Sequence, residues 1–457
     1  MARHGRLDQI TNNNLFCNFR VRFLSISAAQ TCVGYCRQSG PLRHGQHREP
    51  SQILLPLSVW HRSLTKYKEH IVKKTILLAA SAATLSAAAA NAETSVTLYG
   101  LIDTGIGYAK VDGSYTDPRT GVKSSLDASR IGSTTGQTAG SRWGLRGKED
   151  LGDGLYATFR LESGFDSNNG TSSQGGRLFG REATIGLGSA DWGEFRLGRQ
   201  YNVATRMLAS LFGSGFGGGF TQLNTGAGLG FSGSNWVRYD NLALYESPSF
   251  GGFRVSAGYA FNADDSNAAQ TGFRTAENTR AITSGLSYQN GPITAYVAYE
   301  QLNASNKLSS AETSATPRSI TVGAAYDFEV VKLAAAYERI TDGWFAGKNL
   351  PSSAAIAGFR GTGSNRFVDG FSANSYLLAL SVPLGGSSSM FGSWQRVDPN
   401  NSDLTGGDST TNTFALGYTY SLSKRTSLYA VGNYTKNFAF QSDAKAIEAS
   451  VGLRHAF

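Results

Sequence analysis

Alternation of apolar with polar or small side chains is the feature that most restricts the fold of this chain. It recurs after residue 92 in segments of about ten residues that are rich in Tyr, Phe, Val, Thr and Gly. In residues 155–162 the odd-numbered positions are all apolar, whereas the even-numbered ones include Thr158, Arg160 and Glu162. A strand sorts such residues onto two faces and a helix does not. We therefore predict an all-β fold whose strands have one apolar and one polar face.

The connections between these segments alternate in length. Seven are short turns, at 151–154, 190–193, 250–252, 290–292, 329–332, 384–388 and 423–426. Eight are longer stretches rich in Gly, Ser, Asn and Asp, around 110–140, 166–176, 201–235, 263–280, 303–318, 341–374, 398–412 and 436–446. Fifteen connections join sixteen strands, and an even number of strands with short turns at one end and long loops at the other is typical of transmembrane barrels. A barrel of about this size leaves an aqueous channel.

The same alternation could occur in a soluble β-sandwich or a secreted adhesin built from β-repeats. Either fold would pack one face of each strand into a dry core. In many segments, however, polar side chains lie on the face opposite the apolar one, and we expect no second apolar face. No stretch after residue 92 could form a membrane-spanning helix, so a membrane protein made of these segments must close its sheet to pair every backbone group. The pattern favours a transmembrane antiparallel β-barrel of sixteen strands.

The formal charge of +9 does not indicate a nucleic-acid partner. Residues 1–92 hold 12 Lys and Arg and 3 Asp and Glu, whereas the remainder is balanced at 30 of each sign. All three cysteines also precede residue 93, and His455 is the only histidine after it. Because covalent hydrolysis needs a nucleophile with a base and zinc needs several ligands, we expect no catalytic residue, no metal and no cofactor. A plugged barrel with a structural or adhesive role remains the alternative.

An export signal precedes the barrel segments. Lys73 and Lys74 are followed by the apolar run 75–80 and by small residues up to Ala92, which is typical of a signal peptide cleaved between Ala92 and Glu93. The run is too short and alanine-rich for a membrane anchor. We therefore divide the chain into residues 72–92 as signal peptide and 93–457 as barrel. For residues 1–71 we assign no fold, and we expect translation to begin at Val72, read from a GUG codon, with a leader domain as the rival interpretation.

Five motifs carry a resemblance to a known family. They are residues 95–103 (SVTLYGLID), 141–152 (SRWGLRGKEDLG), 180–187 (GREATIGL), 193–200 (GEFRLGRQ) and 452–457 (GLRHAF). In these the chain resembles the trimeric general porins of Gram-negative bacteria, most closely those of Burkholderia- and Neisseria-like β-proteobacteria. The resemblance implies a homotrimer in the outer membrane, among lipids and lipopolysaccharide, that lets small hydrophilic solutes and ions diffuse passively. It also implies that the barrel-assembly machinery reads the terminal Phe457.

In this family the third external loop folds into the barrel and faces a ladder of arginines. The resemblance places the ladder at Arg142, Arg181 and Arg238, with Glu162 nearby. Arg142 and Glu162 agree with the alternation, but Arg181 does not, since strict alternation turns Glu182 inward instead. We follow the motif at Arg181 and Arg238, because bulges re-aim side chains at barrel rims.

Parity alone adds Arg146 and Arg160 to the inward-facing residues. A single arginine of this kind can equally be half of a structural ion pair. Several guanidiniums that converge on one constriction keep their charge at physiological pH and create a standing positive potential.

The constriction loop, Tyr201 to about Asn235, contains no Asp or Glu but does contain Arg206. Acidic residues that commonly oppose the arginines in this family are therefore missing, so we predict a marked preference for anions, with Glu162 as the main balancing carboxylate. The loop also holds Gly215, Gly217, Gly218 and Phe220, whose pattern lacks the Lys of a phosphate-binding loop and suits a compact turn instead.

Overall fold

The computed structural model describes residues 95–116, 121–212, 231, 238–263, 275–343, 367–400 and 409–457. The predictions for residues 1–71, for the signal peptide at 72–92 with its cleavage between Ala92 and Glu93, and for the loop residues Gly215, Gly217, Gly218 and Phe220 lie outside these described ranges.

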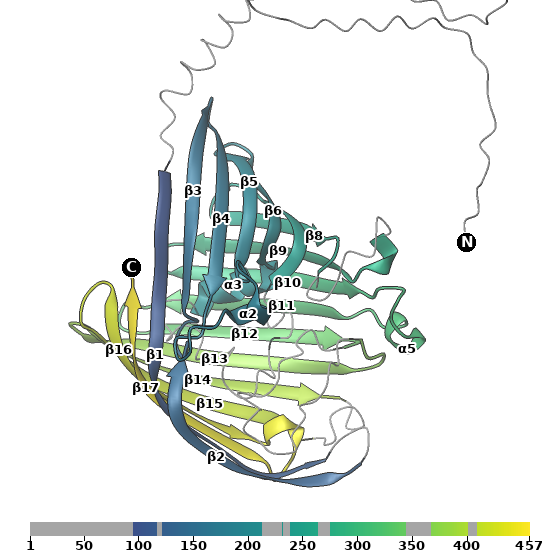
Figure 1. Cartoon of the computed structure of the whole chain (residues 1–457), viewed down its shortest axis with the longest axis vertical. Helices are drawn as coiled ribbons and strands as arrows, with labels where there is room; N and C mark the ends of the chain where they lie inside the picture. The colour runs from purple at the N-terminus through teal and green to yellow at the C-terminus, as the bar shows by residue number, and fades with distance from the viewer. Residues whose placement is uncertain are drawn as a thin grey trace, which may run out of the picture. The chain divides into compact units, whose positions relative to one another are not determined.

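Strands make up most of the described chain (Figure 1). Their bounds are β1 Ser95–Thr116, β2 Lys123–Thr135, β3 Arg142–Gly152, β4 Leu155–Gly164, β5 Glu182–Ser189, β6 Gly193–Tyr201, β7 Arg238–Glu246, β8 Phe253–Ala260, β9 Arg280–Asn290, β10 Ile293–Asn303, β11 Arg318–Asp327, β12 Lys332–Thr341, β13 Ser372–Gly385, β14 Ser388–Pro399, β15 Thr411–Ser421, β16 Thr426–Lys436 and β17 Lys445–Ala456. The helices are α2 Ser173–Gly176, α3 Val203–Phe212, α5 Ser310–Thr313, and the 3-10 turns η3 Thr275–Glu277 and η5 Phe438–Phe440. Within the described ranges, none of these helices has the length and apolar character needed to cross a membrane.

The sheet closes into a ring of sixteen strands, as predicted. Each strand from β3 to β17 pairs antiparallel with the next one along the chain. The long strand β1 pairs with β17 along one edge and, through Ser95–Leu101, with β3 along the other. The seven short turns lie between consecutive strands where the sequence predicted them.

The seventeenth strand, β2, was not predicted. It lies in the stretch 110–140 that we expected to be a loop, and it pairs with the second half of β1, beyond the point where β3 ends. The sequence hides it because its larger apolar residues, Leu126 and Ile131, have opposite parity. The hydroxyl of Ser114 donates a hydrogen bond of 2.5 Å to Asp443, which ties this hairpin to the segment before β17 and lowers the pKa of the Asp443 carboxyl.

The outer face of the barrel is apolar and exposed, as the alternation predicted. Leu98, Ile185 and Val451 expose about three-fifths of their surface, at 60%, 65% and 59%. Such a belt is stable against lipid and would be unfavourable in water.

The inner face is not polar throughout, so the expectation that no second apolar face exists was wrong. The helix α3 lies beside β9 to β11 (Figure 1). Its Met207 and Leu211 are buried against inward-facing small residues of these strands. A Cβ atom at Gly285 would lie 2.6 Å from the Met207 sulfur, and one at Gly323 would lie 2.6 Å from a Leu211 methyl group. Because the apolar residues on this wall are mostly alanine and glycine, the sequence pattern did not distinguish them from the small residues of a polar face.

Barrel closure between β1 and β17 depends on a glycine. Gly100 and Phe457 exchange backbone hydrogen bonds of 3.0 Å, and the Phe457 ring lies over Gly100. A Cβ atom at Gly100 would lie 2.4 Å from the ring and 2.6 Å from the Arg142 carbonyl oxygen, which is backbone and cannot rotate away.

We therefore expect Gly100→Ala to lower the fraction of chain that refolds into the closed barrel, because overpacking of this kind costs about 1–3 kcal/mol. The measurement is the fraction of folded band on unheated gels after refolding into detergent. Gly432→Ala is the matched control, since its Cβ would meet nothing closer than 3.4 Å. Equal folded fractions for the two variants would contradict the closure argument.

Candidate functional site

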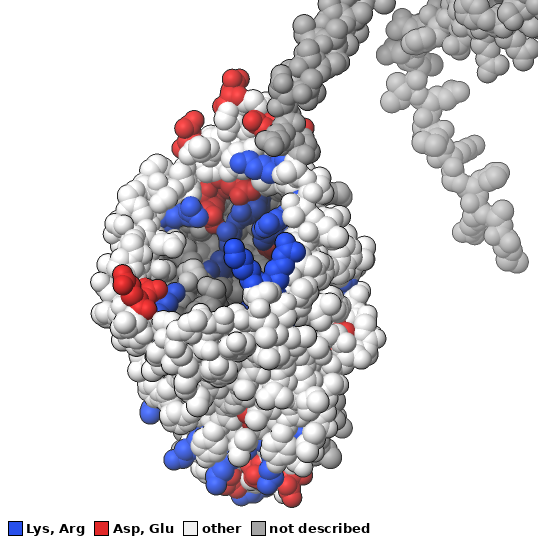
Figure 2. Space-filling model, turned by 90° about the vertical axis from the view of Figure 1, so that its left-hand side faces the viewer, with Lys and Arg blue, Asp and Glu red and all other residues white. Residues whose placement is uncertain are grey.

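Arginines gather on one part of the inner wall. Figure 2 shows a hollow in the molecule with Lys and Arg side chains gathered along its wall and Asp and Glu side chains beside them. We use the term arginine wall for ten arginines and five carboxylates that come from β3 to β8, from α3 and from the segment before β5. Together they carry an excess of five positive formal charges. The members are Arg142, Arg146, Arg160, Arg177, Arg181, Arg196, Arg199, Arg206, Arg238 and Arg254, with Glu162, Glu182, Glu194, Asp240 and Glu246.

Glu162 of β4 lies between two of the predicted arginines. Arg181 donates from Nε to its Oε1 at 2.5 Å, and the Nε of Arg142 is 3.8 Å from its Oε2. The Tyr99 hydroxyl donates to the same Oε2 at 3.0 Å. A single carboxylate is thus shared by two guanidiniums, so this group keeps a net positive charge.

The conflict between Arg181 and Glu182 is resolved by the position at which β5 begins. Glu182 is the first residue of β5 and faces inward, as alternation required, where its Oε2 accepts a hydrogen bond of 2.7 Å from Arg160. The opposite face of β5 carries exposed Ile185 and Leu187. Arg181 precedes the strand, so the alternation does not apply to it, and both residues lie on the arginine wall.

Irregular backbone places Arg199 and Arg238 on the same wall. The register between β6 and β7 shifts between Gly198 and Gln200, so Arg199 turns inward and bonds to Asp240. In β7, Asn241 has a left-handed backbone with φ of 49°, which interrupts the alternation close to Arg238. The extra residue of this bulge is in β7, where Asp240 and Asn241 lie opposite the single residue Arg199 of β6. A bulge therefore lies beside Arg238, whereas Arg181 owes its direction to its place before β5.

Two of the predicted arginines lack a carboxylate partner among the described residues. Arg146 is exposed and its guanidinium lies 5.3 Å from the centre of the Tyr99 ring. Arg238 lies over the Tyr201 ring at 4.1 Å and donates to the Tyr201 hydroxyl.

Sequence reasoning missed four arginines, Arg177, Arg196, Arg199 and Arg254, and most of the balancing carboxylates. Arg177 and Arg199 share Asp240, with Arg177 bound through two hydrogen bonds of 2.9 and 3.0 Å. Arg196 pairs with Glu194 at 2.7 Å. Parity could have found this last pair, because both side chains lie opposite the exposed residues Phe195 and Leu197 of β6. The fourth missed arginine, Arg254, pairs with Glu246.

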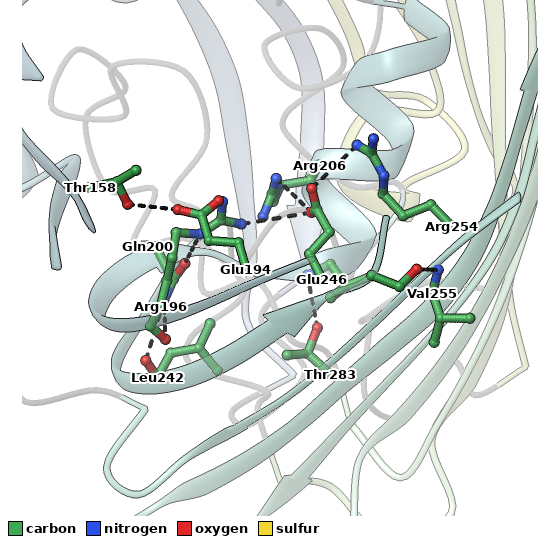
Figure 3. A network of polar contacts seen from close by, with 12 residues as sticks. Thr158, Glu194, Arg196, Gln200, Arg206, Leu242, Glu246, Arg254, Val255 and Thr283 are labelled. Carbon is green, nitrogen blue, oxygen red and sulfur yellow. Dashed lines mark hydrogen bonds and ion pairs between the residues drawn. The ribbon is translucent and has the colours of Figure 1, made fainter. Parts of the chain in front are cut away.

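Glu246 is the meeting point of three arginines. Figure 3 shows Arg196, Arg206 and Arg254 directed toward it from β6, α3 and β8, at 3.7, 2.8 and 3.3 Å. Arg206, which we predicted in the constriction loop, thus ties α3 to the strand wall. Besides Glu162, which pairs with Arg142 and Arg181, an acidic partner for this loop thus comes from β7 rather than from the loop itself.

The first turn of α3 is bound to β10 through Glu300. This fully buried carboxylate accepts hydrogen bonds from the Ala204 backbone N–H at 3.0 Å, from Thr283 at 2.6 Å and from Tyr239 at 2.7 Å. The first N–H groups of a helix have no partner within the helix and favour negative charge nearby. Two carboxylates thus bind α3, Glu300 through the Ala204 N–H and Glu246 through Arg206.

Glu300→Ala should loosen α3, because it removes the acceptor of the Ala204 N–H, and leaving a buried donor unpaired costs about 1–3 kcal/mol. The expected result is faster hydrogen exchange at the Ala204 amide and larger fluctuations of the single-channel current. Glu300→Gln retains an acceptor oxygen and should change both measurements less. Unchanged amide protection in the alanine variant would show that Glu300 does not anchor the helix.

The closed barrel, its apolar exterior and its charged interior define a class of protein: transmembrane β-barrel channels. The family model of Gram-negative porins matches residues 78–439. The chain belongs to the Gram-negative porin family, whose members are channels of the outer membrane, and it is itself an outer-membrane protein.

Individual relatives agree with this assignment. An outer membrane porin protein of Bordetella pertussis is 54% identical over 84% of this chain and all of its own length. Outer membrane porin protein 32 of Delftia acidovorans is 32% identical with the same coverage. Among solved structures, an anion-selective porin from Comamonas acidovorans matches with a TM-score of 0.59 and 29% identity, over 80% of this chain and all of that one.

Proposed function

We propose that this porin is a water-filled channel for the passive diffusion of small hydrophilic solutes and ions, and that it prefers anions. The observation that carries the proposal is the excess of five positive formal charges on the arginine wall. Guanidiniums stay charged at any physiological pH, and charges that line a pore within low-dielectric walls raise the local concentration of the opposite ion.

Two further carboxylates on the inner wall are shielded from solvent. Glu300 and Glu338 are fully buried, and each accepts hydrogen bonds from neighbouring hydroxyl groups. The anion selectivity stated for the Comamonas structure, at 29% identity, supports the same preference here.

We further propose that the protein works as a homotrimer among outer-membrane lipids and lipopolysaccharide, and that Phe457 marks the chain for the barrel-assembly machinery. The Phe457 ring lies on the outer surface with 44% of the residue exposed, where another protein can reach it before insertion. We assign the channel no catalytic activity and no cofactor.

Substitution of Arg142 or Arg181, the two arginines that share Glu162, tests the preference for anions. Arg142→Ala and Arg181→Ala should each lower the anion-to-cation permeability ratio about twofold. One charge about 8 Å from a passing ion contributes about 0.5 kcal/mol in water, which screening over one Debye length lowers to about 0.2 kcal/mol, with opposite sign for an anion and a cation. The measurement is the reversal potential of the refolded channel in a planar bilayer under a salt gradient. Arg425→Ala, in the turn between β15 and β16, removes the same charge away from the arginine wall and is the control. A wild-type ratio near unity would refute the anion preference.

The export signal has its own test. We propose that residues 72–92 are a signal peptide, that residues 1–71 are not translated, and that the mature chain begins at Glu93. Mass spectrometry of the protein purified from outer membranes should give Glu93 as the first residue. Peptides from residues 1–60 in the precursor would overturn the late start.

A further inference from the structure

Tyr201, the last residue of β6, bridges two arginines of the wall. Its hydroxyl oxygen accepts a hydrogen bond of 2.6 Å from Nη2 of Arg181 and another from Nη2 of Arg238. The Arg238 guanidinium also lies over the Tyr201 ring, with its central carbon 4.1 Å from the ring centre. A neutral side chain thus holds two positive charges side by side.

Arg238 depends on this tyrosine more than Arg181 does. Arg181 also donates to Glu162, but Arg238 has no carboxylate within 4.0 Å among the described residues. Its Nε is buried without a hydrogen-bond partner in that part of the chain. Two guanidiniums this close repel each other, so the hydroxyl and the ring face of Tyr201 are what oppose their separation.

We propose that Tyr201 is a positioning residue for anion selectivity: it fixes Arg181 and Arg238 next to each other, so that their potentials add at one point of the solute path. The proposal rests on the anion preference proposed above and deepens it. A carboxylate could hold the same pair, but it would cancel one of the two charges. A tyrosine hydroxyl accepts both hydrogen bonds and leaves both charges in place.

Tyr201→Phe tests this without changing the number of charges. It removes the shared acceptor and keeps the ring, so we expect the anion-to-cation permeability ratio to fall roughly twofold, as for the loss of one nearby charge. Tyr296→Phe is the matched control, because Tyr296 lies on the inner face of β10 with a hydroxyl that has no hydrogen-bond partner in the described structure. Its permeability ratio should equal that of the wild type.

A double variant separates positioning from a general structural effect. If Tyr201 acts by placing Arg238, Tyr201→Phe should have little further effect on the reversal potential of the Arg238→Ala channel. Equal ratios for Tyr201→Phe and the wild type, or a full additional loss in the Arg238→Ala background, would overturn the proposal.

Crystal structures of the wild type and Tyr201→Phe give a readout that does not depend on selectivity. We expect the Arg238 guanidinium to move away from Arg181 in the variant. If the wild-type channel proves unselective, the anion preference fails, but this comparison still decides whether Tyr201 positions the pair. A guanidinium that keeps its place in the variant would refute the positioning role.

Discussion

Every backbone N–H and C=O group of a strand in the membrane must find its partner within the protein, because lipid offers none. In this chain that requirement is met where β1 pairs with both β17 and β3. The close approach of Phe457 to Gly100 is part of this seam, and it explains why a residue without a side chain stands there. Once the ring of strands is closed, each strand has one face toward lipid and one toward the interior. The inward faces then determine where α3 packs and where the arginine wall lies.

The interior is divided into two chemically different parts. Small residues on β9 to β11 leave room for the apolar side of α3, and the buried Glu300 binds the first turn of this helix. The other part carries the arginine wall, which Arg206 of the same helix joins through Glu246. Because Glu300 binds the first turn of α3 and Glu246 binds its Arg206, the helix occupies a defined place inside the barrel.

The sequence predicted the exterior of the barrel better than its interior. Period-two alternation and the spacing of turns were sufficient for sixteen strands and seven turns, since lipid imposes an apolar outer face on every strand. The inner face meets no such uniform requirement. The sequence pattern therefore did not identify the part of the wall that packs against α3, where glycine and alanine are needed for close packing. It also missed β2, because the apolar residues of this strand do not keep one parity. Arg199 was hidden by the bulge between β6 and β7, because two residues of β7 oppose one of β6 there and strict alternation is interrupted.

The arrangement of charges on the wall has a physical limit. Guanidiniums placed together without compensation would repel one another and move into wider parts of the lumen, whereas complete pairing with carboxylates would remove the potential that attracts anions. The wall lies between these extremes. Five carboxylates, each shared by or adjacent to the arginines, hold most of them, and aromatic rings with a hydroxyl hold Arg146 and Arg238. Neutral partners fix the position of a charge without cancelling it, so the aromatic residues that face this lumen belong to the electrostatic structure of the channel as much as its arginines do.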